Sequence, residues 1–397
     1  MRKVLVMLAF FAAVMIASST SFAKTTYVVT NDDNCTTNNT SSIYTLNTTT
    51  GALTLLKSIS TGTAGGCGGF FSDYEATVAQ NAKCLFVYDL GTLNGNSGTT
   101  DIAAFTVPAL KKVGNYTNAS VNGLYGLGGS IALSPNGNFL YATYNGTENI
   151  GAWKVNAGCS LTFIAAYVPK GGADDFSSIK VTPDNHGLVV DAIDIGYVEL
   201  FEINQTSGKL KDLGFASLTG FSSCSSIGCA PEAIDITGDS KEVILGNASV
   251  AEPAVFTASL TPSGPTNAAI WILTNTPNVE NIDVPWLSEA AYKTGTGNLY
   301  LGGSGYTGGV PGVITANFSE TSGITVQNAT EVSSAGNGGI DGEIQTTGTW
   351  MVISEWFNTL QTFTINSNGS ITPSAQGPVV DSNADGGLSF FIYPQTR

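Results

Sequence analysis

Short apolar stretches alternate with polar turns along almost the whole chain. The segment "IALSPNGNFLYATYNGTENIGAWKVN", Ile131 to Asn156, contains a strand, a tight polar turn, a second strand with aromatic residues, a polar loop and a third strand. Such alternation predicts β-strands joined by turns, because a half-buried strand buries every second side chain. No helical apolar pattern of useful length follows residue 24, so the sequence predicts an all-β fold.

The same pattern recurs. Related segments begin at Ile179, Ile234, Ala290 and Glu343, and a more divergent copy begins at Ala76. A spacing of roughly 50 residues with four short strands in each unit is typical of β-propeller blades. A four-stranded sheet cannot bury both faces alone, so the blades are expected to pack against one another around a ring.

The strand positions predict seven blades. Inner strands, termed A, are expected to start near Glu75, Ser130, Ser178, Ala233, Glu289, Asp341 and Leu388. The N-terminal segment "TYVVTN" (Thr26 to Asn31) matches a second strand, B, with no A strand before it. The last strand, "LSFFIYP", is therefore expected to complete the first blade. We predict one domain, residues 24–397, with four-stranded antiparallel blades and a ring closed by the C-terminal strand.

Two motifs carry a family resemblance. "YVVTN" at Tyr27–Asn31, and Ser134–Gly137 ("SPNG") followed by "FLY" at Phe139–Tyr141, resemble bacterial YVTN-type and lactonase-like (6-phosphogluconolactonase-like) seven-bladed propellers. The resemblance implies hydrolysis or formation of a sugar or carboxylic-acid lactone on one face of the ring, by His, Arg and Glu side chains. Propellers of this build serve unrelated functions, so the motifs predict the fold more specifically than the activity.

The chain departs from that family pattern in its basic residues. Beyond residue 23 it has one His, His186, and one Arg, Arg397. His186 falls in the turn "TPDNHG", which is expected to be exposed on the face opposite the candidate site. Without Arg to bind a phosphate or carboxylate, phosphogluconolactone is disfavoured as a substrate. The sequence favours a binding protein without catalytic activity, and the alternative is a divergent lactonase-like hydrolase.

The N-terminus predicts export. Arg2 and Lys3 precede the apolar run Val4–Ala17, and Ser21-Phe22-Ala23 fits a signal-peptidase site. Residues 1–23 are therefore expected to be a signal peptide, and the protein to be secreted or periplasmic. No later segment reaches the roughly 20 apolar residues of a membrane span.

The net charge limits the partners. Without Arg2 and Lys3, 13 basic residues face 30 acidic ones. This balance argues against nucleic acid and anionic membranes as partners, because both require basic patches. We expect a monomer that binds a protein, a glycan or a small molecule.

Strand direction sorts the connections between two faces. If A strands run downward, A–B and C–D turns lie at the bottom, and B–C and D–A connections lie at the top. The long D–A connections are Thr61–Ser72, Asn115–Gly129, Phe215–Pro231 and Leu273–Trp286. Length without a role in building blades predicts that the top face is functional.

The same map suggests disulfides, since six cysteines follow residue 23 and an even number in an exported chain favours pairing. The expected pairs are Cys35–Cys67, Cys84–Cys159 and Cys224–Cys229. They are interpreted as structural links between or within blades.

Carboxylates gather at the head of the A strands. In the aligned repeats this position holds Glu75, Ser130, Ser178, Ala233, Glu289, Asp341 and Ser389. Glu232 lies one residue away, and Asp73, Glu343 and Asp385 add charge nearby. Glu75, Glu289 and Asp341 are the candidate ligands of a hard cation such as Ca²⁺. The alternative is that these carboxylates cap strand ends and bind water.

Aromatic residues precede several A strands, and they include Trp286. Together with Trp356 in a B–C loop, they are candidates for a stacking platform that binds sugars or peptides. The alternative is that they pack loops onto the ring.

Overall fold

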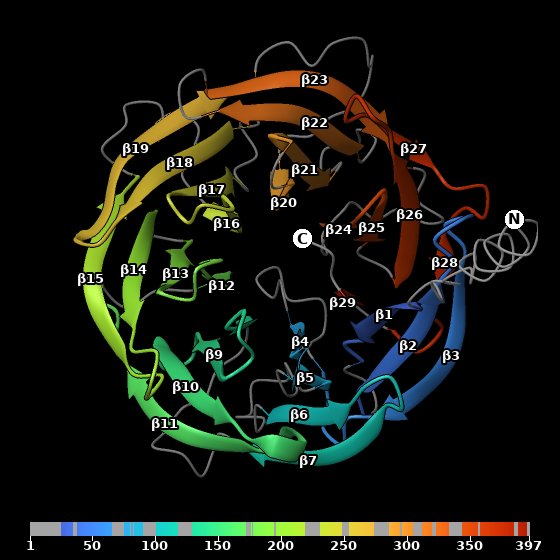
Figure 1. Cartoon of the computed structure of the whole chain (residues 1–397), viewed down its shortest axis with the longest axis horizontal. Helices are drawn as coiled ribbons and strands as arrows, with labels where there is room; N and C mark the ends of the chain where they lie inside the picture. Colours follow the sequence, from blue (N-terminus) through green and yellow to red (C-terminus); the bar gives the residue numbers. More distant parts are fainter. Residues whose placement is uncertain are drawn as a thin grey trace, which may run out of the picture.

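The chain forms a ring of seven β-sheets, and the computed structural model shows them arranged around a central axis (Figure 1). The structure describes residues 25–34, 38–65, 75–79, 81, 83–89, 101–117, 129–171, 176, 178–193, 196–218, 231–247, 254–273, 286–293, 296–304, 312–319, 323–332, 344–355, 358–384 and 388–394. Neighbouring strands within each sheet are antiparallel. The predicted all-β seven-bladed propeller is confirmed.

Blades 1 to 3 follow the N-terminus. Blade 1 contains β29 (Ser389–Tyr393), β1 (Thr26–Asn31), β2 (Thr40–Leu46) and β3 (Leu53–Ser60). Blade 2 contains β4 (Ala76–Ala79), β5 (Cys84–Asp89), β6 (Asp101–Thr106) and β7 (Lys111–Thr117). Blade 3 contains β8 (Ile131–Leu133), β9 (Phe139–Tyr144), β10 (Asn149–Val155) and β11 (Leu161–Tyr167), with the short 3₁₀ turn η2 (Ala157–Cys159) between the last two.

Blades 4 to 7 complete the ring. Blade 4 contains β12 (Ile179–Val181), β13 (Gly187–Ala192), β14 (Tyr197–Ile203) and β15 (Leu210–Ser217). Blade 5 contains β16 (Pro231–Ile236), β17 (Glu242–Asn247), β18 (Ala254–Thr261) and β19 (Gly264–Ile272). Blade 6 contains β20 (Trp286–Lys293), β21 (Asn298–Ser304), β22 (Gly312–Ser319) and β23 (Gly323–Glu331). Blade 7 contains β24 (Ile344–Thr347), β25 (Trp350–Glu355), β26 (Thr359–Ile365), β27 (Ile371–Pro373) and β28 (Val379–Val380).

The two ends of the chain meet in blade 1. Strand β29 pairs with β1 over five residues, from Tyr27 opposite Tyr393 to Asn31 opposite Ser389. The innermost strand of the first blade is thus the last strand of the chain, as the sequence predicted. Because the first blade combines a strand from the C-terminus with three strands from the N-terminus, the ring of blades is closed.

Apolar side chains fill the spaces between consecutive blades. The described core divides into separate clusters, and each joins two neighbouring blades. Between blades 2 and 3, for example, Phe86 and Tyr88 pack against Leu140, Tyr144 and Trp153. A blade therefore buries both of its faces only with its neighbours present, which is the physical reason for the ring.

The recurring "SPNG" turn builds the bottom of several blades. In blade 3 the amide of Gly137 donates to the Ser134 carbonyl, and the Ser134 hydroxyl accepts from the amide of Phe139 at 2.9 Å. Gly137 has φ 72°, a conformation that glycine adopts without strain. In blade 4, Asn185 occupies the equivalent position with φ 66°, and Asn is the residue that best tolerates this conformation after glycine. The sequence pattern that recurs in blades 3 and 4 therefore reflects this shared turn.

Side chains from one inner strand satisfy the free edge of the next. Gln345 in β24 donates to the Phe390 carbonyl at 2.6 Å and accepts from the Ile392 amide at 3.0 Å. Lys180 in β12 donates to the Ile234 carbonyl at 2.9 Å. These contacts join blade 7 to blade 1 and blade 4 to blade 5 around the axis.

Candidate functional site

The predicted position at the head of the A strands is in register in blades 2, 3 and 4. The carbonyl groups of Glu75, Ser130 and Ser178 each accept a hydrogen bond from the B strand of their own blade. The hydroxyl oxygen of Ser389, which opens β29, accepts a hydrogen bond of 2.8 Å from the Glu75 amide of the neighbouring blade. These four residues therefore lie around the top of the inner ring.

Glu232 is displaced from that position by a β-bulge. Ala233 pairs with Gly246, and the register of β16 shifts between Pro231 and Ala233. The bulge accounts for the one-residue offset of Glu232 in the sequence repeat, because a bulge places two residues opposite one. Glu232 is buried, with 1% of its surface exposed.

The remaining predicted residues are described only in part or not at all. Trp286 and Glu289 belong to β20, where their backbones pair with Ser304 and Gly302. Trp286 thus begins the inner strand instead of preceding it. The described part of blade 7 begins at Ile344. The following predicted residues lie outside the described residues: Asp73, Asp341, Glu343, Trp356 and Asp385.

Glu75 belongs to a buried polar network between blades 1 and 2. Asn31, the last residue of β1, donates to Glu75 Oε2 at 2.6 Å. Asn39 donates to Asn31 Oδ1 at 2.5 Å and to Asp89 Oδ1 at 2.6 Å. Thr63 donates to Asp89 Oδ2 at 2.5 Å. The network joins the head of β4 to the ends of β1 and β5, so these amides and carboxyls hold the top of two blades together.

A second buried carboxyl pair lies between blades 7 and 1. Asp32 follows β1 directly and accepts hydrogen bonds from Thr40 at 2.6 Å and Ser42 at 2.8 Å. Asp381 follows β28 and accepts from the Tyr44 hydroxyl at 2.5 Å. Asp32 is fully buried and Asp381 is 1% exposed. No ion pair involves Asp32, Asp89 or Asp381 within the described part of the chain.

Burial changes the acidity of these groups. Loss of water raises the pKa of the Asp89 carboxyl from 3.8 to about 7. Loss of water, with the nearby charge of Asp381 adding to it, raises the pKa of Asp32 from 3.8 to about 7. A carboxyl with such a pKa is half protonated near neutral pH, and it donates a hydrogen bond when protonated. Asp89, between blades 1 and 2, and Asp32, between blades 7 and 1, can therefore each hold a proton in the folded protein.

A metal centre is a different arrangement. Among the described residues, no group of three or more His, Cys, Asp or Glu side chains is placed to hold a metal ion. Among the carboxylates at the strand heads, Glu75 accepts a hydrogen bond from the side-chain amide of Asn31. In this region Glu75 supports the strand-capping alternative raised by the sequence.

Other predicted features have clear positions. His186 lies in the bottom turn between β12 and β13, and its side chain is 70% exposed. It is far from the top of the blades along the strand direction, as expected. Phe176 is fully buried and packs with Ile179 and Tyr197, so this aromatic residue fixes a connection onto the ring.

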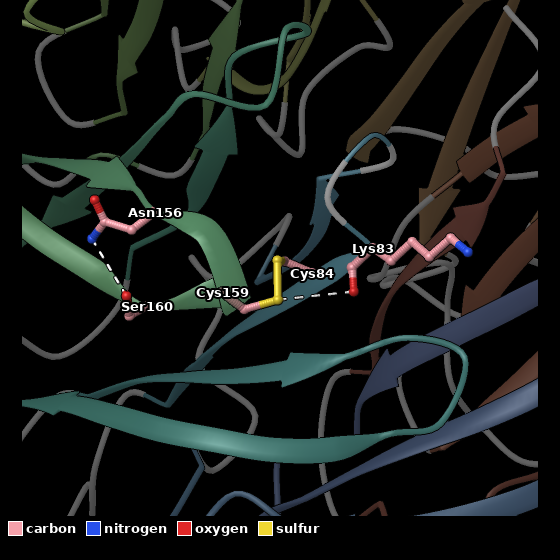
Figure 2. Close-up of a disulfide and its surroundings, with 5 residues drawn as sticks. All are labelled: Lys83, Cys84, Asn156, Cys159 and Ser160. Atoms are coloured by element: carbon pink, nitrogen blue, oxygen red, sulfur yellow. Dashed lines mark hydrogen bonds between the residues drawn. A yellow bond between two sulfur atoms is a disulfide. The ribbon is translucent and has the colours of Figure 1, made fainter.

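One predicted disulfide is formed. Cys84 in β5 is bonded to Cys159 in η2, and it joins the bottoms of blades 2 and 3 (Figure 2). The other predicted pairs, Cys35–Cys67 and Cys224–Cys229, lie outside the described residues. A disulfide between blades is compatible with an oxidising compartment. No helix in the described chain has the length and apolar character needed to cross a membrane.

The connections differ sharply between the two ends of the blades. Bottom connections are short, from residues 47–52 between β2 and β3 to residues 348–349 between β24 and β25. The longest connections all join strand ends at the top of the blades: residues 61–75, 90–100, 118–130, 168–178, 218–230, 273–285 and 332–343. The predicted assignment of long connections to one face is therefore correct.

Comparison with known proteins agrees with this architecture. Residues 99–224 match the family model described as lactonase, seven-bladed β-propeller. A candidate 6-phosphogluconolactonase of Bacteroides fragilis has a TM-score of 0.69 at 14% identity, covering 94% of this chain and 99% of its own. The chain is a seven-bladed β-propeller, and part of it resembles the lactonase family.

Further solved structures share the fold of this chain. A candidate 6-phosphogluconolactonase of Bacteroides uniformis has a TM-score of 0.69 at 10% identity, covering 92% of this chain and 99% of its own. A Lactobacillus plantarum protein has a TM-score of 0.65 at 14% identity, covering 93% and 100%. No curated protein matches the chain in sequence. At sequence identities of 10–14%, these similarities support the fold of this chain and nothing beyond it.

Sequence reasoning missed the acids at the ends of the B strands. Asp32 directly follows β1, and Asp89 ends β5, so the two occupy matching places in blades 1 and 2. Aligning B-strand ends, in the way that A-strand heads were aligned, would have shown them. Their partners Asn39 and Asp381 come from other connections, which no single repeat reveals.

Proposed function

We propose that the protein is an exported binding protein that recognises its ligand at the top of the ring. The observation that supports this most is the separation of roles between the faces. Bottom turns close hairpins, whereas the longest connections gather at the top. Connections that are not needed for building blades are where propellers and other rigid scaffolds place recognition.

The carboxyl network supports binding more than catalysis. Glu75 is 1% exposed and Asp89 is fully buried, so neither side chain presents a free carboxylate to a substrate. Both are held by Asn side chains of blade 1. They give the top of blades 1 and 2 a fixed shape on which a glycan, a peptide or a small molecule binds. Trp286, Trp356, Glu289 and Asp341 complete the proposed ligand-binding surface.

Ligand screening with matched variants tests this proposal. The full-length exported protein is screened against a panel of glycans and peptides. The ligands found are then titrated against Lys170→Glu and Ser382→Arg at exposed top positions, and against His186→Ala at the bottom. We expect a top variant to weaken binding at least tenfold and the bottom variant to leave it unchanged. Loss of binding only in the bottom variant would contradict the proposal.

A second candidate is a lactonase-like hydrolase, which the family match favours. Its site would use Glu75, Glu289 and Asp341 at the channel mouth, with Ca²⁺ as the cation that oxygen ligands suit. Hydrolysis of gluconolactone above the spontaneous rate, lost on chelation and in Asp341→Asn, would support it. Equal rates with and without the protein would exclude it for that lactone.

A further inference from the structure

Lysines are concentrated at the bottom of the propeller. Seven of them lie in bottom turns or at the bottom ends of strands: Lys83, Lys111, Lys154, Lys209, Lys211, Lys241 and Lys293. The described carboxylates at this end are fewer, namely Asp184, Glu202, Asp235, Asp239 and Glu242, and Asp235 is paired with Lys180. The described bottom face is therefore net positive, although the whole chain has a net charge of −15.

Five of these lysines have no ion-pair partner among the described residues, and one of the five, Lys293, donates to the Gly348 carbonyl at 2.7 Å. Lys211 pairs with Glu202 at 3.2 Å and Lys241 pairs with Asp239 at 3.0 Å. In contrast, the described residues include no ion-pair partner for any member of a second group, which we call the basal lysines. The basal lysines are Lys83, Lys111, Lys154 and Lys209, and all four are exposed.

The basal lysines form an arc over three consecutive blades. Lys83 and Lys111 belong to blade 2, Lys154 to blade 3 and Lys209 to blade 4. The disulfide between Cys84 and Cys159 links blades 2 and 3 within this arc, and Lys83 immediately precedes the first of these cysteines (Figure 2). The covalent link fixes the lysines of the two blades relative to each other.

The carboxyls at the top ends of the blades lie too far away to cancel this arc. The buried carboxyls Asp32, Glu75 and Asp89 are at the top ends of their blades. A strand of six residues rises about 20 Å, which is about twice the screening length at physiological ionic strength. A partner at the bottom face is therefore screened from these top carboxyls and meets the local excess of lysines over carboxylates.

The bottom face is also built from short turns alone. Its connections hold no long segment that could enclose a ligand, so the face suits a flat partner. Together with the expected export, these observations lead us to infer that the basal lysines dock the propeller on an anionic phospholipid bilayer. Net charge alone argued against such a partner, and the sorting of charge between the faces revises that expectation. The inference is independent of the ligand proposed for the top face.

The electrostatics set the size of the effect. Each lysine near an anionic membrane strengthens binding about fivefold. Four lysines acting together therefore strengthen it on the order of several hundredfold, and this gain falls as salt shortens the screening length. Neutral vesicles should gain nothing from these side chains.

Vesicle sedimentation tests the inference. The full-length protein is mixed with vesicles of 30% phosphatidylglycerol in phosphatidylcholine, and with pure phosphatidylcholine, at low and high salt. We expect binding to the anionic vesicles only, weakened by salt. The variant Lys83→Gln/Lys111→Gln/Lys154→Gln/Lys209→Gln should bind at least a hundredfold more weakly, with an unchanged melting temperature.

The matched control is Lys170→Gln, because Lys170 is 63% exposed but lies near the top of blade 4. Its vesicle binding should stay within twofold of that of the unmodified protein. The inference would be overturned if the variant with all four basal lysines changed to Gln bound anionic vesicles as well as the unmodified protein does. It would also be overturned if the unmodified protein did not bind anionic vesicles. Binding of soluble polyphosphate without binding of vesicles would overturn it as well.

Discussion

The hydroxyl of Tyr44 donates a hydrogen bond of 2.5 Å to the carboxyl of Asp381, across the seam where the last blade meets the first. Both side chains are buried, and the charge of Asp381 acts on Asp32 in the same seam. Asp32 and Asp381 thus share a buried interface in which hydroxyl groups donate to them. No lysine of the described chain forms an ion pair with either carboxyl. The protonation of the interface between blades 7 and 1, which closes the ring, therefore depends on pH.

The first prediction concerns stability and pH. Burial raises the pKa of Asp32, Asp89 and Glu199 to about 7, so the folded state holds protons that the unfolded chain releases near pH 4. These groups stabilise the fold fully below pH 4, and their contribution is lost as pH rises toward 7. We expect the urea midpoint to be lower at pH 8 than at pH 5.

A single substitution should reduce that dependence. Asp89→Asn keeps an acceptor for Asn39 and offers a donor to Thr63, so it mimics the protonated acid. We expect it to raise the free energy of unfolding at pH 8 by on the order of 1–3 kcal/mol and to change it little at pH 5. The control is Asp239→Asn, since Asp239 is exposed and Lys241 lowers its pKa. A steeper pH dependence in Asp89→Asn would contradict the argument.

The second prediction concerns the inner edge of the ring. Gln345 satisfies both the Phe390 carbonyl and the Ile392 amide. Gln345→Leu leaves both groups without that partner, at a cost of about 1–3 kcal/mol in the free energy of unfolding. Urea denaturation measures this cost. Gln327→Leu is the control, because the Gln327 amide is exposed, and it should change stability by less than about 0.5 kcal/mol.

The third prediction concerns the covalent link between blades. Replacing Cys84 and Cys159 with alanine removes a cross-link that spans 75 residues of sequence. We expect a loss of about 2–4 kcal/mol in stability, seen as a lower melting temperature. Substitution is preferred to a reducing agent, since the chain has four other cysteines. An unchanged melting temperature would show that apolar packing between Phe86 and Trp153 suffices to hold the two blades.

The fourth prediction concerns ring closure. A chain that ends at residue 387 lacks β29, so β1 loses its pairing partner and the apolar groups of Phe390 and Ile392. We expect this truncation to be insoluble on expression. A chain that ends at residue 394 keeps β29 and should fold normally. A soluble, cooperatively folding shorter chain would mean that the inner strand of blade 1 is dispensable.

The fold could be predicted because it rests on local signals. The turn at Ser134–Gly137 has counterparts between the A and B strands of blades 4 and 5, and an unpaired B strand at Thr26–Asn31 requires a partner from the other end of the chain. Both signals are present in short stretches of sequence. The blade count and the pairing of β29 with β1 followed from them.

The site could be predicted only in part, because its contacts join distant segments. The position of Glu75 followed from the repeat, but its partner Asn31 belongs to another blade. The bulge at Glu232 inserts one residue without changing the apolar pattern. The raised pKa of Asp89 depends on burial between blades, a property of the assembled ring.

The pairing of β29 with β1 also sets the order of events when the protein is made. The first blade waits for residues 389–393, which leave the ribosome after every other strand. Until then blade 1 lacks its innermost strand, although both neighbouring blades have been made, and the ring stays open. Late closure of the ring would suit the export expected from the sequence, because a polypeptide whose ring is still open can be threaded through a narrow secretion pore.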